Sequence, residues 1–351
     1  MAPSQRRRTP AIRHVTIRDV AARAGVSTTT VSHALNGKGR IDPATRDRVF
    51  DAAAHLGYRA SRAARALRMR RTGAIAFVVA AFERERVATQ TQMLGLDLYM
   101  HQASAAAAAA FERDHALLLI PPIDAGGELN GLGIDGAIVC DPLRDDPLVT
   151  AFEALDVPVV TIERDLARPR SPWYVRADNE ADTLELLDHL QAAGARRVAM
   201  LSVDAEIAWS HETASAYRRW CAHRGQPPVI VPASPHRLEN SAYEMACALL
   251  DGPDPPDAIF ASAERFSTGV IRAARERGLR IPADLMVATG IDSWEAREAT
   301  PPVTAVDVQP ALQGAAAAEL LIARIAGETP DAPRITPSTL RVRASTDRAA
   351  R

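Results

Sequence analysis

A segment near the N-terminus, residues 15–59, constrains the fold of this 351-residue chain more than any other part. Thr16 can cap a first helix, with Asp19 three positions later as the reciprocal acid of a capping box. Gly25 allows a sharp turn, and Ser27 can cap a second helix. Two short helices joined by a tight glycine turn predict a helix-turn-helix.

The same segment carries the apolar pattern of a small three-helix domain. A third helix is expected from Asp42–Pro43, where proline is tolerated at the first helical position, to Gly57. The apolar positions on the inner faces of the three helices are Ile17, Val20, Ala21, Ala24, Val26, Val31, Leu35, Val49, Ala53 and Leu56. The outward positions of the second helix are Thr28, Thr29, Ser32 and His33.

Charge separates this N-terminal segment from the rest of the chain. Residues 1–72 hold 16 Lys and Arg against four Asp and Glu, whereas residues 73–351 hold 26 against 39. The formal net charge of −1 is therefore the sum of a basic N-terminal segment and an acidic remainder of the chain. Basic charge concentrated on a small helical domain favours binding to the phosphate backbone of nucleic acid. The alternative is a solvated basic face or tail, and residues 1–14 are expected to form a disordered basic arm.

From Gly73 onward, short β-rich runs alternate with alanine- and leucine-rich helical stretches. Strands are expected at 74–79, 116–120, 137–139, 159–162, 198–201, 229–231, 258–260 and 285–288. Helices are expected at 94–113, 180–193, 213–224, 241–250, 267–277 and 310–326. Near-continuous apolar strands that alternate with helices predict doubly wound parallel sheets. Because more than eight strands in one sheet would be unusual, two sheets are the simpler interpretation.

Several classes of function find no support in the sequence. The N-terminus has no apolar signal region and the chain has no run of about 18 apolar residues, so a cytoplasmic location without a membrane partner is expected. Cys140, Cys221 and Cys247 are widely spaced, which favours buried thiols over disulfides or a zinc site. A glycine-rich stretch at 126–133 lacks the lysine and serine of a phosphate-binding loop. We therefore expect no metal, no cofactor and no enzymatic activity.

Long sequence motifs then point to a family. The run T-I-x-D-V-A-x-x-A-G-V-S-x-x-T-V-S-x-x-L-N occupies residues 16–36, T-R-x-R-V follows at 45–49 and L-G-Y at 56–58. These motifs resemble the lactose-repressor (LacI/GalR) family of bacterial transcription regulators. The resemblance continues more thinly through the body of the chain, at residues 175–181, 194–199 and 272–285.

The resemblance implies an all-α helix-turn-helix headpiece followed by an α/β two-lobed core like that of periplasmic sugar-binding proteins. It divides the chain into a headpiece at 15–59, a hinge at 60–72, a core at 73–340 and a C-terminal tail at 341–351. Within the core, the first lobe is expected at about 74–174 plus 305–336, and the second at about 175–304. In this family a homodimer binds a palindromic operator in double-stranded DNA, most often as a repressor, and a small molecule in the cleft between the lobes modulates it.

The resemblance also assigns DNA contacts. Thr28, Thr29 and His33 match positions that read bases, although many relatives have an arginine where this chain has His33. For His33, the alternative is a partly buried side chain that stabilises the turn. The candidates for contacts to the DNA backbone are Thr16, Ser27, Ser32, Asn36, Arg40, Thr45 and Tyr58. Serine and asparagine at helix ends are equally good caps, so a structural role is the alternative for them.

Residues 61–67 can form a short hinge helix. Its DNA-binding candidates are Ser61, Arg62, Ala64 and Leu67, and Leu67 matches a family leucine that wedges between base pairs at the operator centre. A helix this short is marginal in water, so we expect it to order only on DNA.

Polar residues that follow strands predict the ligand site, because open α/β sheets bind ligands at the carboxyl ends of their strands. The polar residues just after expected strands are Asp141, Glu163, Arg164, Glu264, Arg265 and Asp292, and Thr213 stands where an arginine usually opens a helix in the family. The ligand candidates from these positions are Asp141, Arg164, Thr213, Glu264 and Asp292, and the acid of Gly290–Asp292 matches one that commonly holds a sugar hydroxyl in the family. A sugar-like effector is therefore implied. Two family anchors differ, because Thr213 replaces an arginine and Ala263–Glu264 replaces an Asn-Asp pair. A constitutive regulator without effector response, or a small-molecule binding protein without a specific operator, is the alternative.

Overall fold

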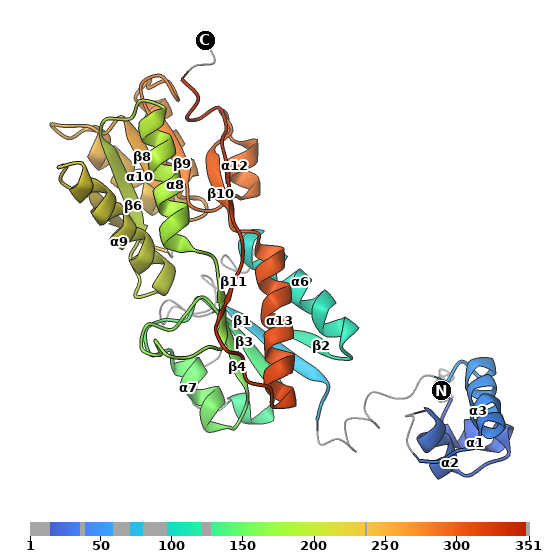
Figure 1. Ribbon diagram of the computed structural model, residues 1–351. Coiled ribbons are helices and arrows are strands. Elements are labelled where there is room, and N and C mark those ends of the chain that lie inside the picture. The colour runs from blue at the N-terminus through green and yellow to red at the C-terminus, as the bar shows by residue number, and fades with distance from the viewer. Residues whose placement is uncertain are drawn as a thin grey trace, which may run out of the picture. The chain divides into compact units, whose positions relative to one another are not determined.

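The computed structural model describes residues 15–35, 39–58, 71–79, 97–120, 128–235 and 237–348. The chain separates into two compact units, residues 1–72 and 73–351, whose elements are labelled in Figure 1. The predicted arm at 1–14 lies outside the described residues, and so do the predicted DNA contacts Asn36, Ser61, Arg62, Ala64 and Leu67. Within the described part of the chain, no helix is both long and apolar enough to cross a membrane.

The N-terminal unit contains the three predicted helices. They are α1 (Ile17–Ala24), α2 (Thr28–Leu35) and α3 (Pro43–His55). Gly25, between α1 and α2, has a φ of 68°, a left-handed conformation that glycine adopts without steric strain. Val20, Val31 and Val49 are fully buried, one from each helix. The glycine turn therefore folds α2 back so that one small core holds all three helices.

The first lobe of the larger unit is a six-stranded sheet in the order β11-β5-β4-β3-β1-β2. Its strands are β1 (Ala74–Val79), β2 (Ala116–Ile120), β3 (Gly136–Cys140), β4 (Val159–Ile162), β5 (Tyr174–Arg176) and β11 (Arg334–Ile335). All neighbouring strands are parallel, as their apolar runs predict. The helices of this lobe are α6 (Asp97–Glu112), α7 (Pro147–Ala154) and α13 (Pro310–Ala326), with a short 3₁₀ turn, η1 (Glu128–Gly131).

Helices α6 and α13 lie side by side and pack closely at one crossing point (Figure 1). A Cβ atom on Gly314 of α13 would lie 2.0 Å from the carbonyl oxygen of Gln102 on α6, so only glycine fits there. Beside this contact, Gln102 Nε2 donates a hydrogen bond to Gln313 Oε1 at 2.9 Å. The close approach of the two backbones therefore fixes a pair of buried glutamines.

The second lobe is another six-stranded sheet, in the order β12-β10-β9-β8-β6-β7. Its strands are β6 (Val198–Val203), β7 (Ile230–Ala233), β8 (Ala258–Ala261), β9 (Met286–Thr289), β10 (Thr304–Asp307) and β12 (Thr339–Arg341). Its helices are α8 (Asn179–Ala192), α9 (Ala208–His223), α10 (Leu238–Leu250), α11 (Phe266–Glu276) and α12 (Trp294–Glu298). The described pairs are parallel except that of β12 with β10, which is antiparallel.

Three borders expected from the sequence fall inside strands and need correction. The border at 174/175 cuts β5, which belongs to the first sheet, and the border at 304/305 cuts β10, which belongs to the second. The tail predicted at 341–351 begins inside β12. Ser345 beyond that strand is fully buried, and its hydroxyl donates to the Val287 carbonyl oxygen at 2.6 Å. The chain therefore crosses between the lobes after β5, β10 and β11.

Helix starts show the other differences from the sequence prediction. Helix α9 begins at Ala208 and not, as predicted, at Thr213. Its N-cap, Ile207, makes no side-chain capping bond, so the sequence carries no capping signal at the observed start. Helices α7 and α12 were not predicted, although Asp146 and Ser293 cap them through their side chains. Both are short, eight and five residues, so they show too little periodicity for a helix prediction.

Candidate functional site

Helix α2 of the N-terminal unit presents a polar surface. The hydroxyl of Ser27 accepts a hydrogen bond from the Thr30 backbone N–H at 3.0 Å, so Ser27 caps the helix as predicted. Thr28, Thr29 and His33 are exposed, and Ser32 is half-buried. The predicted base-reading residues therefore share an accessible helix.

His33 is the residue for which two roles were expected. Its side chain is exposed, which does not support a buried role within the turn. The imidazole lies beside Gly39, since a Cβ atom there would come within 3.2 Å of His33 Nδ1. Glycine at position 39 therefore leaves room for the ring of His33.

The predicted DNA-backbone contacts divide into accessible and engaged side chains. Thr16 and Arg40 are exposed, and Thr16 donates its backbone N–H to Asp19 Oδ2 at 2.8 Å. The Thr45 hydroxyl accepts from Arg48 at 3.1 Å, and Tyr58 packs half-buried against the three-helix core. Thr45 and Tyr58 therefore also stabilise the fold.

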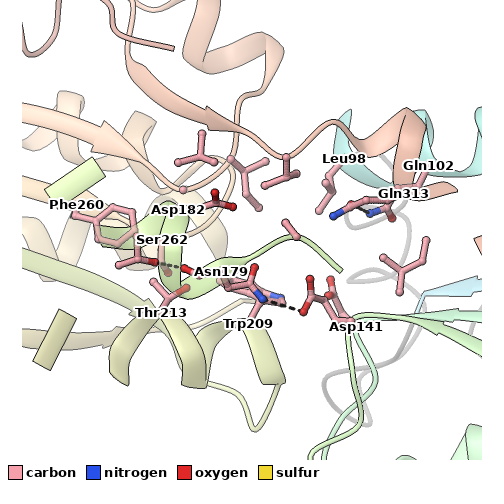
Figure 2. A pocket seen from close by; sticks show the side chains of 18 residues that line it. Leu98, Gln102, Asp141, Asn179, Asp182, Trp209, Thr213, Phe260, Ser262 and Gln313 are labelled. Carbon is pink, nitrogen blue, oxygen red and sulfur yellow. Dashed lines mark hydrogen bonds between the residues drawn. The ribbon is translucent and has the colours of Figure 1, made fainter. Parts of the chain in front are cut away.

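A cleft between the two lobes is the main cavity candidate of the larger unit. It encloses about 610 Å³, open solvent included, and is lined by residues of both lobes (Figure 2). Gln102 of α6 and Gln313 of α13 line it from the first lobe, and Ser262 lines it just after β8 of the second lobe. Interfaces between two domains are preferred sites for small-molecule ligands.

Two of the predicted ligand residues, Asp141 and Thr213, line this cleft. Asp141 follows β3 and its carboxylate accepts a hydrogen bond from the Tyr99 hydroxyl. Burial raises the pKa of Asp141 to about 6, while hydrogen bonds from Tyr99 and Trp209 lower it. Thr213 lies on α9 and is buried.

The other three predicted residues do not line the cleft, because each is engaged elsewhere. Arg164 Nε donates to Glu212 at 2.7 Å. Asp292 accepts from Arg343 at 2.9 Å and does not reach the cleft, although its neighbours Gly290 and Ile291 do. Glu264 lines a smaller adjoining cavity of about 420 Å³. The structure therefore does not bring Arg164 and Asp292 into the site with Asp141 and Thr213, whereas Glu264 lies in the adjoining cavity, which Asp141 also lines.

Glu264 instead joins the two lobes. Its carboxylate accepts hydrogen bonds from the backbone N–H groups of Asp97, at 3.1 Å, and Leu98, at 3.4 Å, at the N-terminus of α6. Asp97 in turn accepts from the Trp294 backbone N–H of α12 at 2.6 Å and from Arg297 at 3.1 Å. Burial raises the pKa of Glu264 to about 7, and the two backbone hydrogen bonds lower it. Each lobe thus supplies a carboxylate to a helix N-terminus of the other, where the helix dipole favours negative charge.

Several cleft residues were not among the predicted ligand residues. Glu163 follows β4 by the same strand-end signal as Asp141, and Asn179 Nδ2 donates to its carboxylate at 3.0 Å. Gln102, Gln313 and Ser262 line the cleft as well (Figure 2). The two glutamines lie on helices, and no strand-end pattern identifies them.

Comparisons with known proteins agree with these observations. A sequence profile described as bacterial regulatory proteins, lacI family, matches residues 16–61, and a periplasmic binding protein-like domain matches residues 187–346. The chain is 32% identical over 338 residues to the HTH-type transcriptional regulator CelR of Thermobifida fusca, covering 95% of this chain and 97% of that protein. It is 27% identical over 340 residues to catabolite control protein A of Priestia megaterium, covering 95% and 99%.

Two solved structures extend the comparison. A complex of the transcriptional regulator CelR with cellobiose superposes with a TM-score of 0.71 at 30% identity, covering 95% of this chain and all of that one. A lac repressor dimer bound to operator and an anti-inducer superposes with a TM-score of 0.76 at 21% identity, covering 95% and 99%. The second likeness concerns the fold alone.

Proposed function

Since the chain belongs to the LacI family of bacterial regulatory proteins, it is a DNA-binding regulator of transcription and not an enzyme, and we propose that it acts as a dimeric repressor controlled by a small molecule. One observation carries the proposal. Helix α2 presents Thr28, Thr29 and His33 as exposed side chains, on a segment with 16 basic and only four acidic residues. Exposed polar side chains on a recognition helix read base edges, and the surrounding basic charge binds phosphates.

In this proposal the helices of two headpieces enter the half-sites of a palindromic operator. Thr28, Thr29 and His33 contact bases. The backbone contacts are Thr16, Ser27, Ser32, Asn36, Arg40, Thr45 and Tyr58, and the hinge contacts are Ser61, Arg62, Ala64 and Leu67. The residues assigned to the hinge rest on the family motif alone. A regulator of this kind acts in the cytoplasm, where bacterial DNA lies.

Dimerisation is supported by exposed apolar side chains on the first lobe. Met100 and Phe111 of α6 are 45% and 66% exposed, and Leu118 and Leu119 of β2 are 40% and 46% exposed. Among the described strands β2 lies at the end of its sheet, and an edge strand can pair with another chain. An exposed apolar group of this kind is typical of a surface that another protein covers.

Control by a ligand is supported by the interlobe cleft. Gln102 Oε1 and Ser262 Oγ line it, are buried, and have no hydrogen-bond partner among the described residues. Buried polar atoms without partners cost stability, which a ligand would restore. Because the similar structure of CelR is a complex with cellobiose, we expect a ligand about the size of a sugar. The constitutive alternative rests on two family anchors that differ, the arginine that Thr213 replaces and the Asn-Asp pair that Ala263–Glu264 replaces.

The DNA-reading role is tested by selecting bound sequences from random DNA. We expect a palindrome to be enriched, and His33→Ala to relax the preference at one position of each half-site by roughly tenfold. Arg40→Ala should instead weaken all sequences about equally, because a phosphate contact carries no base information. His55→Ala, which removes another exposed histidine on α3, is the matched control and should retain the wild-type preference. Enrichment of no palindrome would contradict the proposal.

The dimer is tested by sedimentation of Phe111→Glu and Leu119→Glu variants. Each change places a charge on the proposed apolar interface, so we expect the wild-type dimer to give way to a 37.7 kDa monomer at micromolar concentration. Leu155→Glu is the control, because Leu155 is also exposed, at 41%, but follows α7. A wild-type chain that sediments as a monomer would refute the dimer.

A further inference from the structure

The interlobe cleft carries charged groups of one sign. Asp141, Glu163 and Asp182 line it, and the described lining residues include no arginine, lysine or histidine. Asp141 and Glu163 are each only 5% exposed. Buried carboxylates without a cation are costly, and they are normally paired.

Two arginines of this region, Arg164 and Arg176, are bonded to another carboxylate. Both donate to Glu212, at 2.7 Å and 3.2 Å. Burial raises the pKa of Glu163 and of Asp182, whereas the charge of Arg176 acts to lower it, and the buried Nε of Arg176 has no hydrogen-bond partner among the described residues. The hydrogen bonds to the cleft acids come instead from neutral groups. Asp141 accepts from the hydroxyl of Tyr99, Glu163 from the amide of Asn179, and Asp182 from the hydroxyl of Ser338.

Unpartnered oxygen atoms point to the same need for a donor. Gln102 Oε1, Asp182 Oδ2 and Ser262 Oγ are buried and have no hydrogen-bond partner among the described residues. Gln102 and Ser262 are each only 2% exposed. Two of the three oxygens can only accept hydrogen bonds, and the hydroxyl can also do so. They come from both lobes, so one ligand that donates hydrogen bonds would satisfy atoms on both sides (Figure 2).

An aromatic side chain adjoins the acids. Trp209 of α9 lines the main cleft and also the adjoining cavity, as Asp141 does. A tryptophan next to carboxylates is a common environment for an ammonium group, because the ring face attracts cations.

We propose that the effector is a protonated amine on a sugar-sized scaffold, held by Asp141 and Glu163 with its N–H groups shared among the unpartnered oxygens. The inference rests on the proposed function, since it names the ligand class of the regulatory cleft. An effector of this kind differs from a neutral sugar in its positive charge. A neutral ligand leaves the buried carboxyls to hold protons, whereas an ammonium group supplies the positive charge itself.

Binding of the ammonium group should release protons from the buried carboxyls. Burial raises the pKa of Asp141 to about 6. Burial, followed by the charges of Asp141 and Glu212, raises the pKa of Glu163 well above its usual range, against the hydrogen bond from Asn179 and the charge of Arg176, which lower it. An ammonium group that enters must displace protons from these carboxyls. The affinity for an amine should therefore rise as pH rises from about 5 to 7.

The test compares three disaccharides that share a scaffold and differ in charge. They are cellobiose, the β-1,4-linked dimer of glucosamine, and its N,N′-diacetyl derivative. We expect the glucosamine dimer to bind the full-length chain roughly tenfold more tightly than either neutral sugar at pH 7, since charge-assisted hydrogen bonds are the stronger ones. Calorimetry in two buffers of different ionisation enthalpy should detect released protons.

Variants assign the effect to the cleft. Glu163→Gln and Asp141→Asn keep the size of the side chain and one acceptor oxygen. That oxygen can still accept from Asn179 or Tyr99, so we expect a folded chain that has lost the tenfold preference. Glu328→Gln removes an exposed acid after α13 and should behave as wild type. The proposal would be overturned if cellobiose bound as tightly as the glucosamine disaccharide, or if the glucosamine disaccharide did not bind. A chain that still selects an operator in that case retains its proposed function, whereas one that selects no DNA fails at the earlier step.

Discussion

Gly314→Ala is expected to lower the free energy of unfolding of the core by about 3 kcal/mol. The added methyl group would lie 2.0 Å from the carbonyl oxygen of Gln102 and 2.7 Å from its carbonyl carbon. These are backbone atoms, so the clash can be relieved only by moving α13 away from α6. Thermal unfolding should show the loss as a fall in Tm of about 6 °C or more.

Gly131→Ala is the matched control for this change. Nothing lies within 4 Å of a Cβ atom at Gly131, so the same substitution should alter stability by no more than about 0.5 kcal/mol. Ligand binding in the cleft provides a second measurement of this change, because Gln102 and its partner Gln313 line the cleft beside the crossing point of the two helices. A Gly314→Ala variant with wild-type stability would mean that the two helices can separate without cost.

The architecture was largely predictable because it depends on patterns that are local in sequence. Strands such as β1 and β2 are continuous apolar runs, and their bounds agree with those expected. The headpiece helices have a glycine turn and capping residues at their ends. Strands β5, β10, β11 and β12 were missed. Three of them have only two or three residues, and pairing between distant segments, such as that of β10 with β12, makes them strands.

The ligand site was predictable only in part, for a different reason. The strand-end rule found Asp141, but it also selected Arg164 and Asp292, whose side chains form ion pairs outside the cleft. Such pairings join residues far apart in sequence, and no local pattern reports them. The two glutamines of α6 and α13 enter the site only because Gly314 lets those helices approach each other.

The larger unit should become less stable as pH rises, opposite to the trend of a protein stabilised by ionised carboxylates. Burial raises the pKa of Glu264 from 4.5 to about 7, and that of Asp141 from 3.8 to about 6. Between the unfolded and folded values the folded state binds more protons than the unfolded state, so stability falls as pH rises through this window and levels off above it. The two shifts together correspond to a fall of about 5 kcal/mol between pH 4.5 and 7.5, measured by urea unfolding. The raised pKa of Glu163 adds to this fall, the lowered pKa of His189 opposes it, and Asp165, whose pKa is lowered, acts below this window.

The substitution Glu264→Gln keeps the contact between the lobes and removes the ionisation of Glu264 from the pH dependence of stability. A glutamine can still accept hydrogen bonds from the N–H groups of Asp97 and Leu98, but it does not ionise. The charges of Glu295 and Asp97 also raise the pKa of Glu264, so the glutamine removes like-charge repulsion at high pH. We therefore expect the variant to match the wild type near pH 4.5 and to exceed it at pH 7.5, with the fall reduced by about half. Glu328→Gln should leave the profile unchanged, and an unaltered slope in Glu264→Gln would show that the carboxylate joining the lobes is not the group that titrates.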